Sequence, residues 1–364
     1  MQPTLMRAWQ LERPGGALTL VDRPVPRARP GAVVVRMQSS VLMSYLRDYV
    51  DGRLPGYQVP SRPFVPGGNG VAIVHEVGRD VWHLRVGQRV MISPYSVARE
   101  NVAEPARMLI GVTAGGEAGR RMQDDWPDGT LADYALLPAA ALTPADALPD
   151  LDARRLATAM RYVVPYGGLL KGRLAAGETV VVSAATGAYG SAAVPLALAL
   201  GAARVIAFGR NAAALGRVVA QAGARAVAVA ASGEVAADAA ALRAAAGGAG
   251  VSLAFDMVGN AADPNLTLAA LHSLNTGGRL VLMGSMAVPL PLPYTEVMRH
   301  GWEILGQFMH ARDAGRGVLA LIAAGLLRPD ACDAATFALP RLPEAIDAAA
   351  RAAGTECVVV DHEA

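Results

Sequence analysis

The sequence contains little charge, few aromatic side chains and almost no cysteine. Charged residues make up 18% of its 364 positions and aromatic residues 5%, and the 33 lysines and arginines nearly balance the 31 aspartates and glutamates. Because a nucleic-acid-binding surface needs a basic excess, this balance argues against nucleic acid as the main partner. The two cysteines, Cys332 and Cys357, are too few for a disulfide framework or a four-thiolate zinc site.

Long apolar runs are missing as well. The longest candidate segment, residues 192–208, is interrupted by a proline, a glycine and an arginine, so it falls short of the roughly 18 apolar residues that a bilayer span requires. Charged side chains stand within residues 1–16, where a signal peptide has an apolar stretch. We therefore expect a cytoplasmic protein that does not cross a membrane.

Apolar residues, at 53%, and 39 glycines are abundant, and this composition excludes a disordered chain. The length corresponds to roughly two domains. Residues 1–135 consist of short β-branched runs separated by glycine and proline, which is typical of an antiparallel or barrel-like domain. From about residue 152 such runs alternate with alanine-rich stretches, the pattern of a parallel sheet with helices on both faces.

The tail of the chain returns to the first pattern. We therefore predict a β-rich domain over residues 1–151 and 310–364, and an α/β domain with a doubly wound parallel sheet over residues 152–309. The strands expected in the second domain cover residues 178–185, 204–209, 226–230, 251–258, 278–284 and 302–309.

One turn in the α/β domain predicts a ligand. The strand that ends at Ser183 is followed by Ala184-Ala185-Thr186-Gly187-Ala188-Tyr189-Gly190 and then by an apolar helix. A strand, a glycine-rich turn and a helix N-terminus in this order form the pyrophosphate site of dinucleotide-binding domains. Glycine lets the backbone approach the phosphates, and the helix end offers unpaired N–H groups. Two of the usual three glycines are present, and Ala185 occupies the first position.

The end of the next strand indicates which dinucleotide binds. It reads Phe208-Gly209-Arg210-Asn211, and no carboxylate stands where one would bind a ribose 2′-hydroxyl. An arginine can hold a 2′-phosphate by charge-assisted hydrogen bonds, so the sequence favours NADP(H) over NAD(H). Alternatively Arg210 is a solvated side chain beside a helix that Asn211 caps, and both roles can coexist.

Several motifs in order identify a family resemblance. Residues 66–78 read PGGNGVAIVHEVG, residues 86–90 read VGQRV, and residues 255–259 and 278–284 read FDMVG and GRLVLMG. With the glycine turn, these motifs resemble the medium-chain dehydrogenase/reductase superfamily over essentially the whole chain. The resemblance implies a GroES-like β-rich catalytic domain joined to a Rossmann domain that binds a nicotinamide cofactor.

The resemblance also implies where the cofactor binds, because the strands at 255–259 and 278–284 line the nicotinamide side of the cleft in that superfamily. We expect NADP(H) to contact residues of the glycine turn, of the end of the second strand and of these two strands, with a few others. The expected set is Met43, Val164, Thr186, Gly187, Ala188, Tyr189, Gly190, Gly209, Arg210, Asn211, Val258, Gly284 and Ser285.

Zinc-dependent members of the superfamily hold a catalytic zinc with a cysteine, a histidine and a third ligand. Matched position by position, these places fall on Met43, Gly68 and Met160, none of which is a zinc ligand. Residues 92–125, where such members carry four cysteines for a structural zinc, contain no cysteine. We therefore expect no metal, and leave open a scattered site of His75, His83 and a carboxylate.

Without a metal to polarise a carbonyl, the favoured reaction is hydride transfer to an acceptor that is already activated. A conjugated C=C bond or a quinone accepts hydride at carbon and needs only hydrogen-bond donors and a proton source at its oxygen. The zinc-free members of the superfamily, which are quinone oxidoreductase-like and enoyl reductase-like, do this kind of chemistry. Residues 67–72 resemble the enoyl reductases, except that a glutamate is missing between Asn69 and Gly70.

Hydroxyl groups near Met43 are candidates for the proton donor or oxyanion partner. Tyr45 follows Met43 by two positions, where zinc-dependent members carry the hydroxyl of a proton relay. Tyr57 lies about where enoyl thioester reductases place a functional tyrosine, and Ser44 and Tyr95 are weaker candidates. Alternatively Tyr45 only packs under the cofactor and water supplies the proton.

The leading hypothesis is therefore an NADPH-dependent, zinc-free reductase of an activated C=C bond or a quinone. Two alternatives stay open: a zinc-independent alcohol dehydrogenase or carbonyl reductase, and a catalytically silent NADPH-binding protein.

The resemblance further implies a homodimer in which the strand at 302–309 pairs across a two-fold axis and covers a sheet edge. Met286, Tyr294 and Met298 then line either a substrate wall or a subunit interface, or fill the core.

Overall fold

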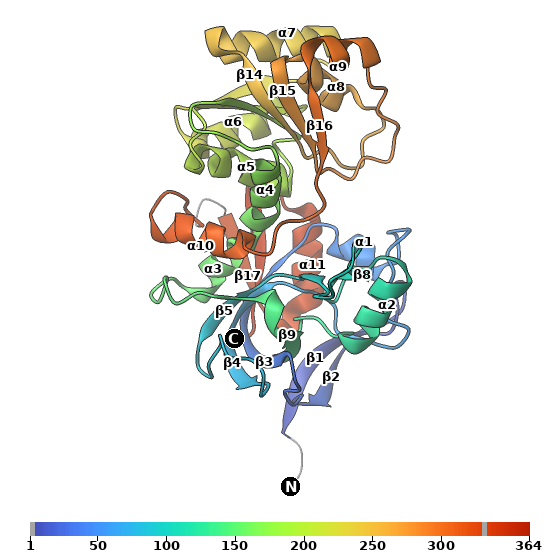
Figure 1. The fold of residues 1–364 in the computed structure, drawn as a ribbon. Coiled ribbons are helices and arrows are strands. Elements are labelled where there is room, and N and C mark those ends of the chain that lie inside the picture. Colours follow the sequence, from blue (N-terminus) through green and yellow to red (C-terminus); the bar gives the residue numbers. More distant parts are fainter. Residues whose placement is uncertain (1–3, 330–332) are drawn as a thin grey trace. The chain divides into compact units, whose positions relative to one another are not determined.

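The computed structural model describes residues 4–329 and 333–364, and the chain divides into two compact units (Figure 1). Unit 1 comprises Met1–Met160, Cys332–Ala352 and Cys357–Ala364, and unit 2 comprises Arg161–Ala331 and Ala353–Glu356. Of the two cysteines, Cys332 lies outside the described residues and Cys357 is buried.

The unit boundaries differ from the predicted ones at residues 151/152 and 309/310. Helix α10 (Ala314–Ala323) belongs to unit 2, since it packs directly against helix α4 (Met160–Lys171). A Cβ atom on Gly317 of α10 would lie 2.3 Å from the hydroxyl oxygen of Tyr166 in α4, so the helices approach more closely than a larger side chain permits. Unit 2 is also not one continuous insertion, because Ala353–Glu356 returns to it.

Unit 1 is built on a seven-stranded sheet in the order β10-β5-β4-β3-β18-β17, with β9 also paired to β3. The strands of this sheet are β3 (Ala32–Leu42), β4 (Gly70–Val77), β5 (Arg89–Ile92), β9 (Tyr134–Pro138), β10 (Leu142–Pro144), β17 (Asp333–Ala338) and β18 (Glu356–Asp361). The remaining elements are the ribbon β1 (Leu5–Leu11) and β2 (Leu18–Pro24), the small sheet β6 (Tyr95–Val97), β7 (Arg107–Leu109) and β8 (Thr113–Ala114), helices α1 (Leu46–Val50), α2 (Gly116–Asp125), α3 (Ala153–Thr158) and α11 (Leu342–Arg351), and short 3₁₀ turns at Ala139–Ala141 and Leu339–Arg341.

Strand β3 lies at the centre of unit 1 because it carries an almost unbroken run of buried residues. Val33, Val35 and Met37 pack in one apolar cluster with residues of β4 and β5. The end of the strand joins a second cluster that contains residues of β1 and α11. The tail of the chain folds back onto this sheet, where β18 lies antiparallel to β3 with Val360 opposite Ser40.

Unit 2 contains a six-stranded parallel sheet in the order β13-β12-β11-β14-β15-β16. Its strands are β11 (Thr179–Ser183), β12 (Arg204–Gly209), β13 (Ala226–Ala230), β14 (Val251–Asp256), β15 (Leu274–Leu282) and β16 (Glu303–Gly306). Its helices, besides α4 and α10, are α5 (Ala188–Ala199), α6 (Ala212–Ala222), α7 (Val235–Ala246), α8 (Asn265–His272) and α9 (Tyr294–His300), with a 3₁₀ turn at Gly247–Ala249. The predicted α/β class with a doubly wound sheet is confirmed.

Helices cover both faces of this parallel sheet (Figure 1). Helices α7 and α8 pack on one face, in an apolar cluster that includes Phe208 of β12 and Leu280 of β15. Helices α5 and α6 pack together against β11 and β12. The order of the strands along the chain reverses between β11 and β14. Open α/β sheets bind ligands at such a switch point, just beyond the carboxyl ends of the strands. None of the helices in the described ranges is long and apolar enough to span a bilayer.

Candidate functional site

The glycine turn lies at the carboxyl end of β11. Ser183 ends this strand, and α5 begins at Ala188 with Gly187 as its N-cap residue. A Cβ atom on Gly190 would lie 2.2 Å from the carbonyl oxygen of Ala184, so glycine is required where the helix starts against the turn. A Cβ atom on Gly187 would lie 3.4 Å from the same carbonyl oxygen of Ala184, which is an ordinary van der Waals distance. Of the two predicted glycines, Gly190 is therefore the one that packing demands.

Ala184 adopts a backbone conformation that favours glycine. Its φ is 52°, in the left-handed region that side chains with a Cβ atom rarely occupy. The sequence pattern assigned the missing first glycine to Ala185, whereas the structure places the glycine-like conformation one residue earlier. Ala185 itself is buried, and its N–H donates to the carbonyl oxygen of Phe208 at 3.1 Å, which ties the turn to the end of β12.

The end of β12 brings further predicted residues beside the turn. A Cβ atom on Gly209 would lie 3.8 Å from Oγ1 of Thr186, so the threonine hydroxyl lies next to the strand end. Asn211 caps α6 by accepting the N–H of Ala214 at 3.0 Å, which confirms the capping prediction. Arg210 is exposed, and within the described part of the chain its guanidinium makes no hydrogen bond or ion pair. The position thus offers a positive charge at the strand end.

The ends of β14 and β15 pack tightly against each other. A Cβ atom on Gly284 would lie 2.0 Å from the carbonyl oxygen of Val258, and the Gly284 N–H donates to the carbonyl oxygen of Asp256 at 3.1 Å. A Cβ atom on Gly259 would lie 2.9 Å from Oγ of Ser285. The structure therefore brings together the predicted Val258, Gly284 and Ser285, at the same sheet edge as the glycine turn.

A buried carboxyl group that the sequence analysis missed lies under this edge. Asp256 ends β14 and accepts a hydrogen bond from the hydroxyl of Thr267 at 2.8 Å and one from the backbone N–H of Val258. Burial raises the pKa of Asp256 from 3.8 to about 6, against the lowering effect of these two hydrogen bonds. Opposite it in the sheet, Ser183 has a buried hydroxyl without a hydrogen-bond partner in the described chain.

The other predicted cofactor residues of unit 2 are half-buried. Ala188 and Tyr189 form the first turn of α5, and Val164 lies in α4. Met43, the last of the predicted set, belongs to unit 1, where it is half-buried just before α1.

Two of the predicted catalytic residues lie together around α1 in unit 1. The rings of Tyr45 and Tyr57 are 6.4 Å apart, and Ser44 beside them is exposed. Tyr49, which the sequence analysis missed, contacts Tyr57 edge-on with ring centres 5.9 Å apart. Burial raises the pKa of Tyr49 and of Tyr57, so both phenols are protonated at neutral pH and are weaker acids than a solvated tyrosine.

Tyr49 is 1% exposed, yet its hydroxyl has no hydrogen-bond partner among the residues that the structure describes. The available signal was the spacing of Tyr45 and Tyr49, since residues four apart share one face of a helix. Tyr95, the weaker candidate, lies half-buried in β6, which pairs with β7.

The positions matched to zinc ligands do not fit a zinc ion. Met43 and Met160 offer thioethers, and Gly68 offers no side chain. A Cβ atom on Gly68 would lie 2.3 Å from the carbonyl oxygen of Ile110 and 2.6 Å from Cβ of Pro94, so no imidazole fits there. Across residues 4–329 and 333–364, no three His, Cys, Asp or Glu side chains lie close enough together to hold a metal ion.

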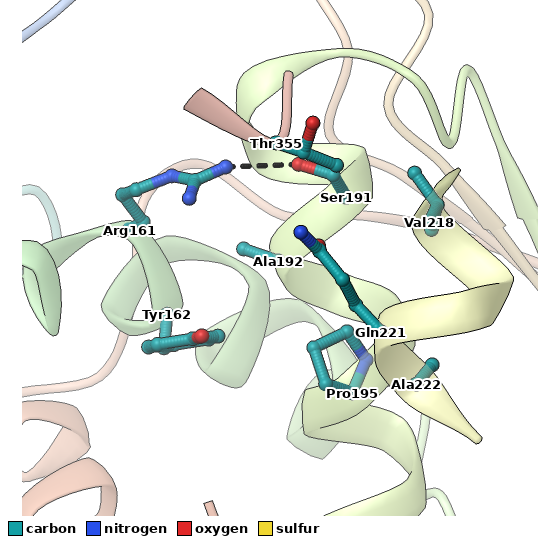
Figure 2. Close-up of a pocket in the computed structure, with 9 residues that line it drawn as sticks. All are labelled: Arg161, Tyr162, Ser191, Ala192, Pro195, Val218, Gln221, Ala222 and Thr355. Carbon is teal, nitrogen blue, oxygen red and sulfur yellow. Dashed lines mark hydrogen bonds between the residues drawn. The ribbon is translucent and has the colours of Figure 1, made fainter. Parts of the chain in front are cut away.

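A small pocket of unit 2 lies beside the first half of α5 (Figure 2). Its lining residues are Arg161, Tyr162, Ser191, Ala192, Pro195, Val218, Gln221, Ala222 and Thr355. The space inside it is about 10 Å³, which is room for roughly one water molecule and too little for a substrate. The feature of interest is therefore not the space but Arg161, a buried arginine that the sequence analysis did not single out.

Comparisons with known proteins agree with this geometry. The family model described as "Alcohol dehydrogenase GroES-like domain" matches residues 29–150, within unit 1, and the one described as "Zinc-binding dehydrogenase" matches residues 188–324, within unit 2. The chain belongs to the medium-chain dehydrogenase/reductase superfamily. Its placement in the zinc-free branch of this superfamily goes beyond these matches and stays a prediction.

Curated proteins are similar to parts of this chain. An alcohol dehydrogenase of Rhizobium meliloti (strain 1021) is 30% identical over 195 residues, which are 51% of this chain and 53% of the relative. The chain spans from about a quarter to about half of the length of the curated relatives that it matches.

Two solved structures show the same fold at low identity. A structure named for a zinc-binding dehydrogenase of Sinorhizobium meliloti 1021 bound to NADP is 20% identical, with a TM-score of 0.76 over 98% of this chain and 99% of that chain. A structure named for an E. coli CFT073 short chain alcohol dehydrogenase complexed with NADH is 19% identical, with a TM-score of 0.78 over the same shares. At these identities the two structures show only that the fold is shared.

Proposed function

We propose that this chain is an NADP(H)-dependent oxidoreductase that transfers hydride to an activated C=C bond or a quinone without zinc. The site supports nucleotide binding because the turn after β11, the end of β12 and the packed ends of β14 and β15 all lie at one sheet edge. Gly190 and Gly284 are required by close contacts with the backbone oxygens of Ala184 and Val258, and such tight packing beside the glycine turn is typical of dinucleotide-binding domains.

The observation that carries the cofactor preference is Arg210. It is exposed at the end of β12, where a carboxylate would repel a 2′-phosphate and an arginine can bind one. The names of the related structures do not decide between the cofactors, since one contains NADP and the other NADH.

The zinc-free chemistry rests on unit 1. The positions of Met43, Gly68 and Met160 provide no metal ligand, so no step of the reaction is assigned to a metal. A bound nicotinamide supplies the hydride. Tyr45 is the first proposed proton donor to the oxygen at which negative charge develops, with Tyr57 and Ser44 as the next candidates, and both tyrosines lie in one cluster.

A second candidate function is the oxidation of an alcohol or reduction of a saturated carbonyl, again without zinc. The observation that favours it is the name of the Rhizobium meliloti relative, an alcohol dehydrogenase.

We also keep the proposal of a homodimer, because β16 is the edge strand of the parallel sheet, and Tyr294 and Met298 of the neighbouring helix α9 are 82% and 62% exposed. Sedimentation velocity of the purified chain tests the dimer.

Cofactor binding is tested by titrating the full chain with NADPH and with NADH and following nucleotide fluorescence. We expect tighter binding of NADPH, and we expect Arg210→Asp to weaken NADPH binding by about 10- to 100-fold with little effect on NADH. Arg217→Asp is the matched control, because Arg217 is an exposed arginine on the same helix that Asn211 caps. An unchanged preference in Arg210→Asp would contradict the cofactor assignment.

The reaction is tested by following NADPH oxidation with a 2-alkenal, a 1,4-quinone and a saturated ketone, beside metal analysis of the protein. Turnover of the alkenal or quinone is expected, whereas turnover of the ketone alone would favour the second candidate. Tyr45→Phe is expected to lower kcat by about 10²- to 10⁴-fold if Tyr45 donates the proton. Full turnover in Tyr45→Phe would assign that proton to another group or to water.

A further inference from the structure

Arg161 is a buried cation that touches the start of the nucleotide-binding helix. It lies in α4 with 7% of its surface exposed. Its Nη2 donates to Oγ of Ser191 at 2.9 Å (Figure 2). The same nitrogen donates to the carbonyl oxygen of Ala188 at 3.0 Å and to the carbonyl oxygen of Gly354. Ser191 Oγ also lies within hydrogen-bond distance of the Gly354 carbonyl oxygen. One guanidinium thus joins α4, the first turn of α5 and residues 353–356.

Gly354 touches the glycine turn itself. A Cβ atom on Gly354 would lie 2.1 Å from the carbonyl oxygen of Thr186 and 2.7 Å from that of Gly187. The backbone of residues 353–356 is therefore pressed against these two carbonyl groups. In a trans peptide the C=O and N–H groups point in opposite directions, so the N–H that follows Gly187 is turned away from Gly354.

That orientation matters because the first N–H groups of an α-helix have no intrahelical acceptor and bind anions. The first hydrogen bond of α5 runs from the N–H of Ser191 to the carbonyl oxygen of Gly187, at 2.9 Å. The N–H groups ahead of Ser191 are those that a pyrophosphate would use. Burial lowers the pKa of Arg161, but an arginine stays protonated in proteins, so the guanidinium also adds positive charge beside this end.

We infer that Arg161 is a positioning residue for the pyrophosphate of the bound nucleotide. It holds Gly354 against the turn, and this contact fixes the peptide between Gly187 and Ala188 with its N–H toward the ligand. The inference rests on the proposed nucleotide binding at this turn. It predicts that Arg161 affects NADPH and NADH alike, because both carry the pyrophosphate, whereas Arg210 discriminates between them.

The test measures nucleotide affinity rather than turnover. The full chain and its variants Arg161→Met and Arg161→Lys are titrated with NADPH and with NADH by calorimetry, and the thermal unfolding midpoint of each is recorded without nucleotide. Arg161→Met is expected to weaken binding of both nucleotides by about tenfold or more, since hydrogen bonds from a charged group are lost. Arg161→Lys keeps the positive charge but lacks the several N–H donors of a planar guanidinium. We expect its nucleotide affinity to lie between those of Arg161→Met and the original protein.

The matched control is Arg279→Met. Arg279 is a second buried arginine of unit 2, 9% exposed, which pairs with Glu178 and donates to the carbonyl oxygen of Arg173 at 3.0 Å. Arg279 lies opposite Glu303 at the start of β16, and Glu178 directly precedes β11, whereas the glycine turn follows the other end of β11. Its replacement is expected to lower the unfolding midpoint while nucleotide affinity stays within about twofold of the original protein.

The outcomes separate the inference from the proposed function. If the unaltered chain binds neither nucleotide, the proposed function fails. If it binds both and Arg161→Met binds them equally well at a lower unfolding midpoint, Arg161 is structural and the inference is overturned. Should Arg161→Met not fold, Ser191→Ala removes one of the contacts and is expected to weaken binding of both nucleotides by about two- to threefold. Unchanged binding in that variant would count against the inference in the same way.

Discussion

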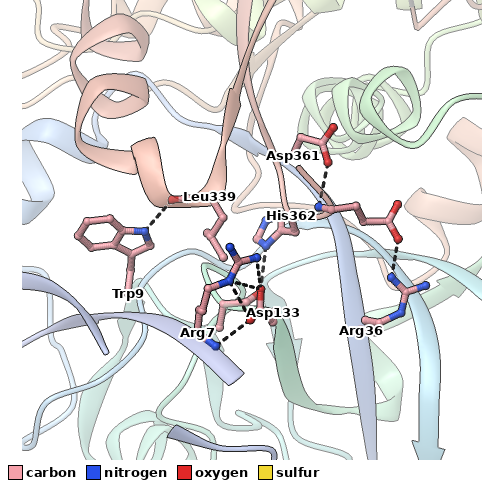
Figure 3. Close-up of polar contacts among 9 residues, drawn as sticks. Arg7, Trp9, Arg36, Asp133, Leu339, Asp361 and His362 are labelled. Atoms are coloured by element: carbon pink, nitrogen blue, oxygen red, sulfur yellow. Dashed lines mark hydrogen bonds and ion pairs between the residues drawn. The ribbon is translucent and has the colours of Figure 1, made fainter. Parts of the chain in front are cut away.

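The tail of the chain in unit 1 and the glycine turn in unit 2 are held in place by different kinds of contact. In unit 1, side chains far apart in sequence form a polar network around the tail (Figure 3). The imidazole of His362 bonds the carbonyl oxygen of Ala132 through Nδ1 at 2.9 Å and Oγ of Ser40 through Nε2 at 3.0 Å, and Arg7 pairs with Asp133 at 3.0 Å. In unit 2 the glycine turn packs through close contacts between backbone atoms, and the Arg161 side chain donates to the carbonyl oxygens of Ala188 and Gly354 beside it.

The two units also differ in their expected response to acid, because each buries a titratable side chain of opposite kind. His362 is neutral in the folded protein, because burial lowers its pKa to about 4 despite the raising effects of Ala132, Asp133 and Asp361. Asp256 of unit 2 has its pKa raised to about 6 by burial. A buried base is destabilised by protonation, whereas a buried acid is stabilised by it, so falling pH weakens one unit and strengthens the other.

The largest expected effect is the acid sensitivity of unit 1. The pKa of His362 is lower in the folded than in the unfolded state, so its contribution is fully present above pH 6.5 and is lost as pH falls toward 4. The loss amounts to about 3 kcal/mol of the free energy of unfolding. Hydrogen exchange of β18 amides at pH 7 and pH 4.5 measures it. His362→Gln should remove most of this pH dependence, and an equal dependence in both proteins would contradict the assignment.

The opposite effect is expected in unit 2. The folded pKa of Asp256 lies above its unfolded value, so the stabilisation is fully present below about pH 4 and is lost as pH rises through 6. The size is again about 2 to 3 kcal/mol. Exchange of β14 amides between pH 4.5 and pH 7.5 measures it, with Asp256→Asn as the non-titrating reference. If β14 and β18 lose protection together on acidification, the contrast between the units is wrong.

The steric part of the comparison is tested at two glycines. Gly190→Ala places a Cβ atom 2.2 Å from a backbone oxygen, whereas Gly187→Ala places one at 3.4 Å. We expect Gly190→Ala to destabilise unit 2 by roughly 1 to 3 kcal/mol and to abolish measurable NADPH binding, since backbone at a packed turn must shift. Gly187→Ala is expected to cost less than about 1 kcal/mol. Calorimetric titration and thermal unfolding compare the two, and equal effects would refute the steric account.

The contrast between the units also separates what the sequence could predict from what it could not. The glycine turn, the parallel strands and the Asn211 cap were predicted because a local steric or hydrogen-bonding rule demands those residue types. Strand ends were less certain: the strand expected at 302–309 covers Glu303–Gly306, and β15 begins at Leu274 rather than at 278. A hydrophobic pattern fixes which strand exists more firmly than where it ends.

The residues that were missed act through partners far along the chain. Arg161 meets Gly354, which is 193 positions away, and His362 meets Ala132, which is 230 positions away. No local pattern marks either pair, because each contact exists only after the tail has folded back. Tyr49 and Asp256 were missed for another reason: their chemistry depends on burial, which neighbouring residues in the sequence do not determine.

A smaller effect is expected in the tyrosine cluster of unit 1. The Tyr49 hydroxyl is buried without a hydrogen-bond partner in the described residues, and such a group costs about 1 to 3 kcal/mol. Tyr49→Phe should therefore stabilise unit 1 by about 1 kcal/mol if the hydroxyl has no role. A loss of turnover in Tyr49→Phe, at unchanged nucleotide affinity, would instead place this hydroxyl in the proton path beside Tyr57. Chemical unfolding together with the NADPH oxidation assay distinguishes these results.

The smallest effect tests whether backbone strain is part of the nucleotide-binding turn. Ala184 has a φ of 52°, which glycine adopts without strain, and its carbonyl oxygen is the atom that excludes a side chain at Gly190. Ala184→Gly relieves the strain but also adds freedom to the unfolded chain, so the two effects partly cancel. We expect a gain of about 0.5 to 1 kcal/mol in unfolding free energy, with NADPH affinity unchanged. Weaker NADPH binding in the stabilised variant would show that the strained backbone of Ala184 holds the turn ready for its ligand.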